Sequence, residues 1–157
     1  MAYLEIDETP EPTPLPTREE AQVEIADWQR RVDALYRDVI DWLPKDAGYE
    51  VDLSWIIPVH ELMLDALELP PYQVPMLQVR RSGERLLIFR PDARWVMFTR
   101  GRVKVGIGDG RWETLLAIES EDESGCVGWT FWDAHNWRRG GDPWNSDVLR
   151  EILEGER

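Results

Sequence analysis

The chain has 157 residues and a formal net charge of -13, from 31 acidic and 18 basic side chains. This length fits one domain plus a tail. No apolar run approaches the roughly 20 residues that span a bilayer, so the sequence predicts a cytoplasmic protein without a membrane segment. The negative charge argues against general binding to DNA or to anionic membranes, because both are polyanions. It favours a partner protein with a basic surface.

Residues 1–16 form a proline-rich, acidic segment in which Pro10, Pro12, Pro14 and Pro16 occupy every second position. Proline fixes its own φ angle and lacks a backbone N–H, so this segment is predicted to be extended and unable to fold alone. We therefore expect a tail over residues 1–16 and a single α+β domain over residues 17–157.

A long helix is predicted over residues 17–43. Thr17 and Glu20 have the spacing of a capping box, and Pro44 ends the helix. Apolar residues follow the cap in alternating steps of four and three: Ala21, Ile25, Trp28, Val32, Leu35, Val39 and Trp42. The favoured interpretation is that this stripe lies across a sheet. The alternative is a homodimer in which the stripe forms a coiled-coil seam.

The remainder of the chain predicts mainly strands. Alternating polarity predicts a strand over 49–57, a short helix is expected over 59–68, and Asn145 or Ser146 caps a last helix. Short turns separate further strands over 74–81, 84–90, 94–99, 102–107, 112–118 and 126–133. Such short links require antiparallel pairing. The predicted fold is therefore α+β, with an antiparallel meander sheet of six to seven strands covered by the two helices.

A basic region lies between acidic flanks, because residues 80–111 contain nine basic and three acidic side chains. Aromatic residues interleave with these cations, and base stacking beside a cationic track is how some sheets bind single-stranded nucleic acid. The candidate polyanion-binding residues are Arg80, Arg85, Arg94, Arg102 and Lys104. The alternative is a sheet face whose arginines meet the acidic tail or the long helix.

A second unusual feature is the loop over residues 134–145 and its tryptophan neighbours. Tryptophan and arginine are enriched at the centres of protein interfaces. The candidate partner-binding residues are Trp132, Trp137, Arg138, Arg139 and Trp144. The alternative is a small core beneath the loop.

Indications of catalysis are weak. Asp133 and His135 are a conceivable acid–base pair, although side chains at this spacing need not meet. Cys126 is expected to be a buried, inert thiol, and His60 has no second histidine at a metal-binding spacing. The sequence predicts no catalytic residues, metal or cofactor.

The sequence favours a non-catalytic protein-binding module, of the accessory, inhibitor, immunity or assembly type, which acts through the tail and the Trp/Arg loop. The alternatives are single-stranded nucleic-acid binding by residues 80–111 and acidic mimicry of a nucleic acid.

Overall fold

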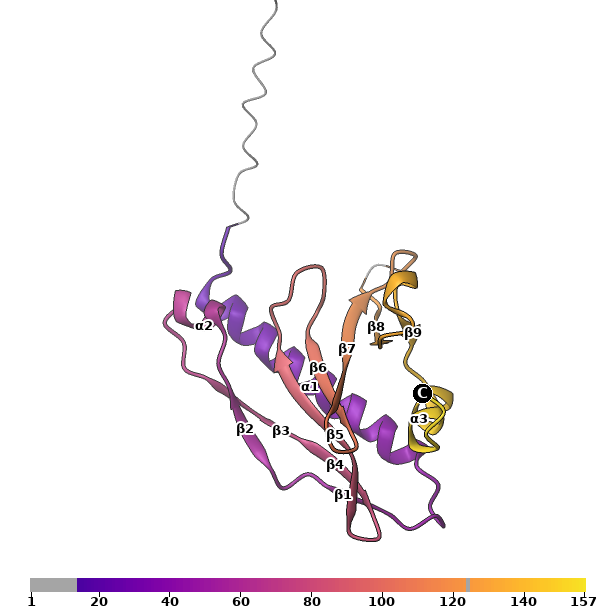
Figure 1. The fold of residues 1–157 in the computed structure, drawn as a ribbon. Helices are drawn as coiled ribbons and strands as arrows, with labels where there is room; N and C mark the ends of the chain where they lie inside the picture. Colours follow the sequence, from indigo (N-terminus) through magenta and orange to yellow (C-terminus); the bar gives the residue numbers. More distant parts are fainter. Residues whose placement is uncertain (1–13, 124) are drawn as a thin grey trace, which may run out of the picture.

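The computed structural model describes residues 14–123 and 125–157 of the chain. It contains a seven-stranded antiparallel sheet with a long helix across one face (Figure 1). The strand order is β1-β4-β5-β6-β7-β8-β9, and β2 and β3 form a separate two-stranded sheet. The predicted α+β fold with an antiparallel sheet, a long N-terminal helix and a short C-terminal helix is confirmed. Residues 1–13 of the predicted tail lie outside the described residues.

The helices are α1 (Arg18–Trp42), α2 (Leu62–Ala66) and α3 (Ser146–Leu153), with a short 3-10 helix η1 (Trp137–Arg139). The strands are β1 (Tyr49–Asp52), β2 (Ile56–Val59), β3 (Tyr72–Pro75), β4 (Leu77–Arg81), β5 (Glu84–Ala93), β6 (Arg102–Ile107), β7 (Arg111–Glu119), β8 (Val127–Trp132) and β9 (Asp142–Pro143).

Helix α1 begins at the predicted capping box. The Thr17 hydroxyl accepts from the Glu20 N–H at 3.1 Å, and the Glu20 carboxylate accepts from the Thr17 N–H at 3.4 Å. The predicted apolar stripe is buried against the sheet at Ala21, Trp28, Val32, Leu35 and Val39. The chain's own sheet therefore covers the surface that a coiled-coil homodimer would need.

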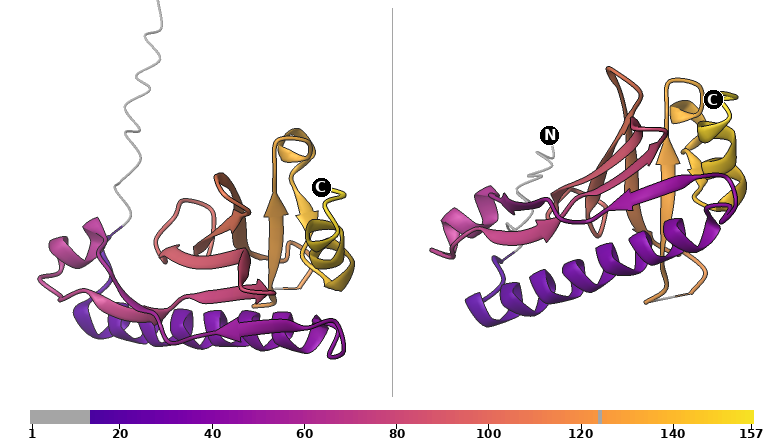
Figure 2. Two further views of the ribbon diagram at one scale, coloured as in Figure 1. Left: turned by 60° about the horizontal axis from the view of Figure 1, so that its bottom comes forward. Right: turned by 90° about the horizontal axis from the view of Figure 1, so that it is seen from below.

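The core lies between α1 and the inner face of the sheet, with α3 beside the β8–β9 end (Figure 2). Strand β6 shows how period-two alternation divides the faces: Val103 and Val105 are buried in the core, whereas Arg102 and Lys104 point the other way. We call the side of the sheet that faces away from α1 the outer face. Within the described chain, no helix has the length and apolarity needed to cross a membrane.

The predicted strand over 49–57 is wrong, because it is two strands with a bend between them. The Asp52 carboxylate accepts hydrogen bonds from the backbone N–H and the hydroxyl of Ser54, at 2.8 and 2.5 Å. This local turn competes with the sheet and ends β1. Trp55 then lies beyond the bend and is 57% exposed, although the alternation predicted a core position.

The neighbouring elements differ from prediction for related reasons. Pro58 lies inside β2 rather than in the first turn of a helix, so the predicted helix over 59–68 shrinks to α2. The predicted strand over 74–81 divides after Pro75 into β3 and β4, which belong to different sheets. The Met76 N–H at this division donates to the Trp55 carbonyl at 2.8 Å.

The predicted strand over 94–99 is a loop. The Glu61 carboxylate accepts from the N–H groups of Arg94 at 3.1 Å and of Trp95 at 3.0 Å. In a continuing strand, these two backbone N–H groups would instead donate to carbonyl groups of a neighbouring strand. Phe98 then adopts a positive φ of 64°, which is compatible with a turn but not with a strand.

Candidate binding site on the outer sheet face

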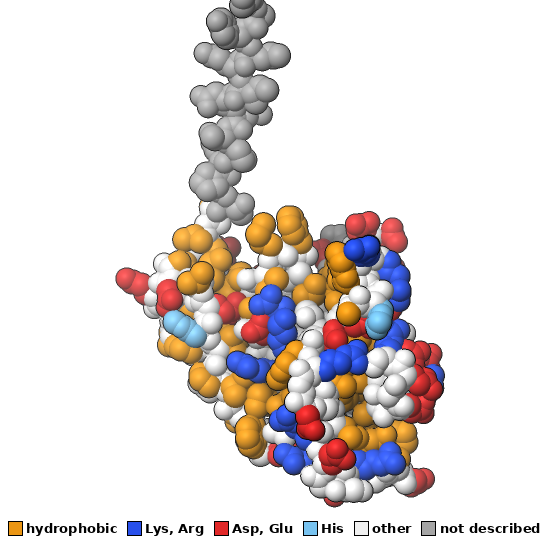
Figure 3. Space-filling model, viewed as in Figure 1, with side chains coloured by type: hydrophobic (Ala, Val, Ile, Leu, Met, Phe, Trp, Pro, Cys, Tyr) orange, Lys and Arg blue, Asp and Glu red, His pale blue; other side chains and the backbone are white. Residues whose placement is uncertain are grey.

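A hollow of about 480 Å³ lies on the outer face, where β2 and the start of β4 approach β5 and β7. Its lining combines apolar and cationic side chains. The residues are Trp55, Ile57, Pro58, Met76, Arg85, Ile88, Arg90 and Trp112. Figure 3 shows this side of the molecule, with arginine and lysine side chains near the middle of the face and hydrophobic side chains beside them. We call this cavity the outer-face hollow.

The outer-face hollow continues into a second depression of about 270 Å³. The two share Arg90 and Trp112, and the second adds Asp92 and Lys104. Strand pairing explains this grouping, because Arg90 of β5 lies opposite Lys104 of β6. The result is a continuous recess that runs across three strands with cations along it.

Trp112 is positioned by the absence of a side chain at Gly106. These residues are paired across β6 and β7, and a Cβ added at Gly106 would lie 3.2 Å from the Trp112 ring and 2.6 Å from Ile88. The bare backbone of Gly106 therefore lets the indole lie across β6 towards Ile88. Trp112 remains 49% exposed, so part of its ring is available to a ligand.

The structure divides the basic region into two groups. Four of its arginines make ion pairs: Arg94 with Glu24, Arg100 with Glu119, Arg102 with Asp92 and Arg111 with Glu113. In contrast, Arg85, Arg90 and Lys104 make no ion pair with any described residue, and Lys104 donates to the Thr114 hydroxyl at 3.2 Å. Arg80 and Arg81 also lack an ion pair among the described residues, but they donate to the Gln78 and Tyr49 side chains. The cations around the outer-face hollow are therefore available to neutralise an external anion.

Three of the predicted polyanion-binding residues do not belong to the cations around the outer-face hollow. Arg94 is 7% exposed and its guanidinium pairs with Glu24 of α1, because the strand that would have carried it ends at Ala93. Arg102 lies on the outer face, but its Nε donates to the Asp92 carboxylate at 2.6 Å. Arg80 donates to the buried Gln78 side chain at 2.8 Å.

Sequence reasoning left Arg90 and Trp112 out of the candidate site. A usable pattern was present for Arg90, since it alternates with Phe89 and must therefore face away from the core. Alternation with the buried Leu115 and Ala117 also places Trp112 on the outer face. Its position beside Ile88 depends on strand pairing, because both residues pair with Gly106, from either side of β6. Trp55 was assigned to the core for the reason given above.

The predicted Trp/Arg loop is largely structural. Trp144 is 9% exposed and packs on Phe131, Trp42 and Phe89, so its placement in a surface patch is wrong. Arg139 pairs with Asp142 at 2.9 Å. Trp132 is half-buried, and its indole N–H is buried without a hydrogen-bond partner among the described residues.

The remaining surface part of that loop is Trp137 with Arg138. Trp137 is 55% exposed, and the Arg138 guanidinium lies 5.0 Å from the centre of its ring. Interface binding by this pair stays a prediction.

A hydrogen-bonded network holds the loop to the C-terminal residue. The buried Asn136 side chain donates to the Phe131 carbonyl and to the Asp142 carboxylate, both at 2.9 Å. Arg157 donates to Asp142 at 2.9 Å and to Glu151 at 2.5 Å, which links the loop to α3. The Asn136 amide, together with Arg157 and Arg139, holds the pKa of the Asp142 carboxyl well below its usual value.

Replacement of Asp142 by asparagine is expected to lower the free energy of unfolding at pH 7 by about 2 kcal/mol, since it removes a carboxylate that accepts charge-assisted hydrogen bonds. A depressed folded pKa contributes stability above the unfolded pKa of about 4, and this contribution is lost as the pH falls towards the folded value. Urea denaturation of both proteins at pH 7 and at pH 3 should therefore show a smaller difference at pH 3. Asp109→Asn, in an exposed turn, is the control and should change stability by less than about 0.5 kcal/mol. An equal difference at both pH values would contradict the assignment.

The hypothesised acid–base pair does not form in the structure. The Asp133 carboxylate accepts hydrogen bonds from the backbone N–H groups of His135 and Asn136, at 2.8 and 2.9 Å. Asp133 is buried, whereas the His135 side chain is exposed. The Asp133 carboxylate therefore stabilises the backbone of the loop through hydrogen bonds and makes none to the His135 imidazole among the described contacts.

Cys126 is exposed, which corrects the expectation of a buried thiol. Its Sγ donates to the Glu123 carboxylate at 3.1 Å, and this contact raises the pKa of the thiol. A raised pKa disfavours the thiolate, which is the nucleophilic form. Within the described ranges, no group of three potential ligand side chains could hold a metal ion.

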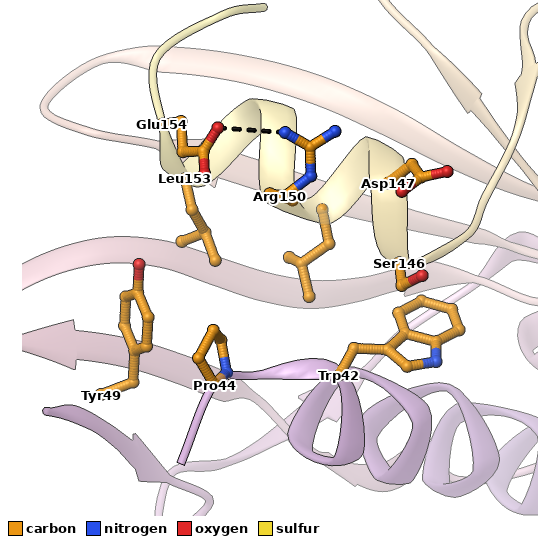
Figure 4. Close-up of a pocket in the computed structure, with 9 residues that line it drawn as sticks. Trp42, Pro44, Tyr49, Ser146, Asp147, Arg150, Leu153 and Glu154 are labelled. Atoms are coloured by element: carbon orange, nitrogen blue, oxygen red, sulfur yellow. Dashed lines mark hydrogen bonds and ion pairs between the residues drawn. The ribbon is translucent and has the colours of Figure 1, made fainter. Parts of the chain in front are cut away.

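A smaller hollow of about 210 Å³ lies between the end of α1 and α3 (Figure 4). Figure 4 shows Trp42, Tyr49 and Leu153 around it. The only cation in its lining, Arg150, already pairs with Glu154 at 3.1 Å. This hollow offers apolar contact but no unpaired cation, so it specifies a ligand less well than the outer-face hollow does.

Comparison of the chain with protein-family models, with curated proteins and with solved structures returned no match.

Proposed function

We propose that this protein is a non-catalytic protein-binding module and that its outer-face hollow binds an extended, acidic segment of a partner protein. The observation that carries the proposal is the placement of Arg85, Arg90 and Lys104, without ion pairs among the described residues, beside the exposed rings of Trp55 and Trp112. Both the surface and the sign of the partner's charge differ from those that the sequence favoured, which were the Trp/Arg loop and a partner with a basic surface.

The chemistry of the hollow selects such a ligand in two ways. Arginine binds carboxylates through directed, charge-assisted hydrogen bonds. Trp55 and Trp112 offer exposed apolar area to side chains that lie between the acids, beside the largely buried Met76 and Ile88. An extended peptide presents alternate side chains to one surface, so acidic and apolar groups can both reach the recess.

A second candidate is single-stranded nucleic acid, favoured by the exposed Trp55 and Trp112 rings beside cations. The net charge of -13 repels every anionic ligand in proportion to the ligand's charge. A nucleic acid carries a charge at each nucleotide, so it is opposed more strongly than a peptide in which apolar residues separate the acids. The protein ligand is therefore preferred. Acidic mimicry stays a prediction. The exposed side of α1 carries both signs of charge, as in the Asp27–Arg30 ion pair, and this does not favour mimicry.

The proposal is tested by fluorescence anisotropy with a labelled peptide of alternating leucine and glutamate. Arg90→Gln is expected to weaken binding about tenfold, as the loss of one charge-assisted contact implies. Arg37→Gln, on α1, and Arg138→Gln, in the loop, remove the same charge elsewhere and should leave the affinity within about twofold. A glutamine version of the peptide should bind weakly to all three.

Two outcomes would replace the proposal. A loss with Arg138→Gln but not with Arg90→Gln would move binding to the Trp/Arg loop. Tighter binding of an oligothymidylate probe, with the same dependence on Arg90, would favour the nucleic-acid candidate. In that case the affinity should also fall steeply with salt.

A further inference from the structure

We propose that the chain's own residues 1–13 occupy the outer-face hollow and compete there with the partner. This inference rests on the proposed function, since it assigns an internal ligand to the same site. The occupant is a segment outside the described residues, and three observations favour it.

The first observation is complementary chemistry. Residues 1–13 contain Glu5, Asp7, Glu8 and Glu11 and no lysine or arginine. Leu4 and Ile6 alternate with the first two acids. The hollow presents the converse arrangement, with unpaired cations beside apolar rings. Residues 1–13 thus bring four acids and no base to a surface whose cations have no ion pair among the described residues.

The second observation is where the segment starts. The first turn of α1 lies next to α2, which is inserted between β2 and β3 (Figure 1). The Arg18 guanidinium contacts the Glu68 carbonyl at 3.5 Å, and Gln29 donates to the Gln73 carbonyl of β3 at 2.9 Å. Strand β2, the partner of β3, supplies Ile57 and Pro58 to the hollow. The start of α1, close to where the described chain begins, therefore lies near the two-stranded sheet that contributes Ile57 and Pro58 to the hollow.

The third observation is reach. An extended chain of 13 residues spans up to about 43 Å. Helix α1, with 25 residues, is about 38 Å long and runs along the sheet. The extended length of the segment is therefore comparable to the length of the helix that runs along the sheet. Pro10 and Pro12 restrict their own φ angles, which reduces the conformational entropy that docking would cost.

Paramagnetic NMR on the full chain tests this contact directly. In a Cys126→Ser background, Thr9→Cys provides one site for a nitroxide label, because Cys126 is the only cysteine. The expected result is at least a twofold loss of intensity for the indole N–H signals of Trp55 and Trp112. Trp137, with an exposed fraction close to that of Trp112, is the internal reference and should keep its intensity. Equal effects on Trp112 and Trp137 would overturn the proposal.

Matched charge variants of the full chain then separate docking from general electrostatics. Neutralising the tail with Glu5→Gln, Asp7→Asn and Glu8→Gln should restore the Trp112 signal and tighten binding of the leucine–glutamate peptide severalfold. The control, Glu121→Gln, Asp122→Asn and Glu123→Gln, removes the same charge from the β7–β8 loop and should do neither. If both triple variants behave alike, the effect is net charge and the proposal is overturned.

The outcomes also distinguish this inference from the proposed function. Peptide binding without selective loss of the Trp112 signal would reject the internal ligand and leave the binding module. Selective loss in the full chain, with no peptide binding even to the variant with the neutralised tail, would support the internal contact and reject the module. A mixture of spin-labelled chains and isotope-labelled chains without the spin label should show no loss, and a loss there would show that the segment docks on a second copy instead.

Discussion

Replacement of Gly101 by alanine is expected to lower the free energy of unfolding by about 3 kcal/mol or more. Gly101 has a φ of 136°, in a region that residues with a side chain rarely adopt. A Cβ there would lie 2.2 Å from the Trp28 ring. Trp28 is fully buried and packs against Trp129, with ring centres 5.8 Å apart, so it has little freedom to move away. Chemical denaturation followed by circular dichroism measures the change.

Three other glycines separate the two causes. Gly108→Ala tests positive φ alone, because φ is 61° and a Cβ would meet nothing within 4 Å. Gly106→Ala tests steric overlap alone, against Ile88 and Trp112. Gly110→Ala has neither problem and should change stability by less than about 0.5 kcal/mol. The cost should be greatest at Gly101, where strain and overlap act together. A Gly101→Ala protein as stable as Gly110→Ala would contradict the close approach to Trp28.

Truncation of Trp144 to alanine is expected to cost about 3–5 kcal/mol, the range for large aromatic side chains removed from a core. Its ring centre lies 5.8 Å from that of Phe131 and 6.1 Å from those of Trp42 and Phe89. Removing the indole would leave a cavity where α1, the sheet and the end of the loop meet. Denaturant unfolding at neutral pH gives the difference.

Trp137→Ala is the matched control, since it removes the same side chain from an exposed position of the same loop. It should alter stability by less than about 0.5 kcal/mol. Trp144→Phe should cost less than the alanine variant, because it keeps an aromatic ring and removes an indole N–H that has no partner among the described residues. If Trp137→Ala proved as destabilising as Trp144→Ala, the division of this loop into core and surface would be wrong.

The errors in strand prediction share one physical origin. At Ser54 and at Arg94 the sequence alternates as a strand does, but a side-chain carboxylate accepts the hydrogen bonds that strand pairing would need. Asp52 accepts from the backbone N–H and hydroxyl of Ser54, and Glu61 accepts from the backbone N–H of Arg94. Asp52 acts locally, two residues away, and a turn there was open to prediction. Glu61 acts from 33 residues away in sequence, so nothing local to Arg94 indicated that the strand would end.

The candidate site was predictable only in part. Period-two alternation places Arg90 and Lys104 on the face opposite Phe89 and Val105, and the sequence contains that information. It does not show that the ion pair of Arg94 with Glu24 joins residues separated by 70 positions. Ion pairing decides which cations are neutralised within the protein and which remain for a ligand.

Caps, turns and apolar periods are local properties of the chain, and they were enough to predict the long capped helix, its buried stripe, the antiparallel sheet and the final helix. The net charge of -13 and the basic region within it were also plain from the sequence. Three properties emerged only in the folded protein: Trp144 is core, Trp55 and Trp112 share a recess, and Arg85, Arg90 and Lys104 have no ion pair among the described residues. These properties depend on contacts between strands that are distant in sequence, and such contacts form only when the sheet does.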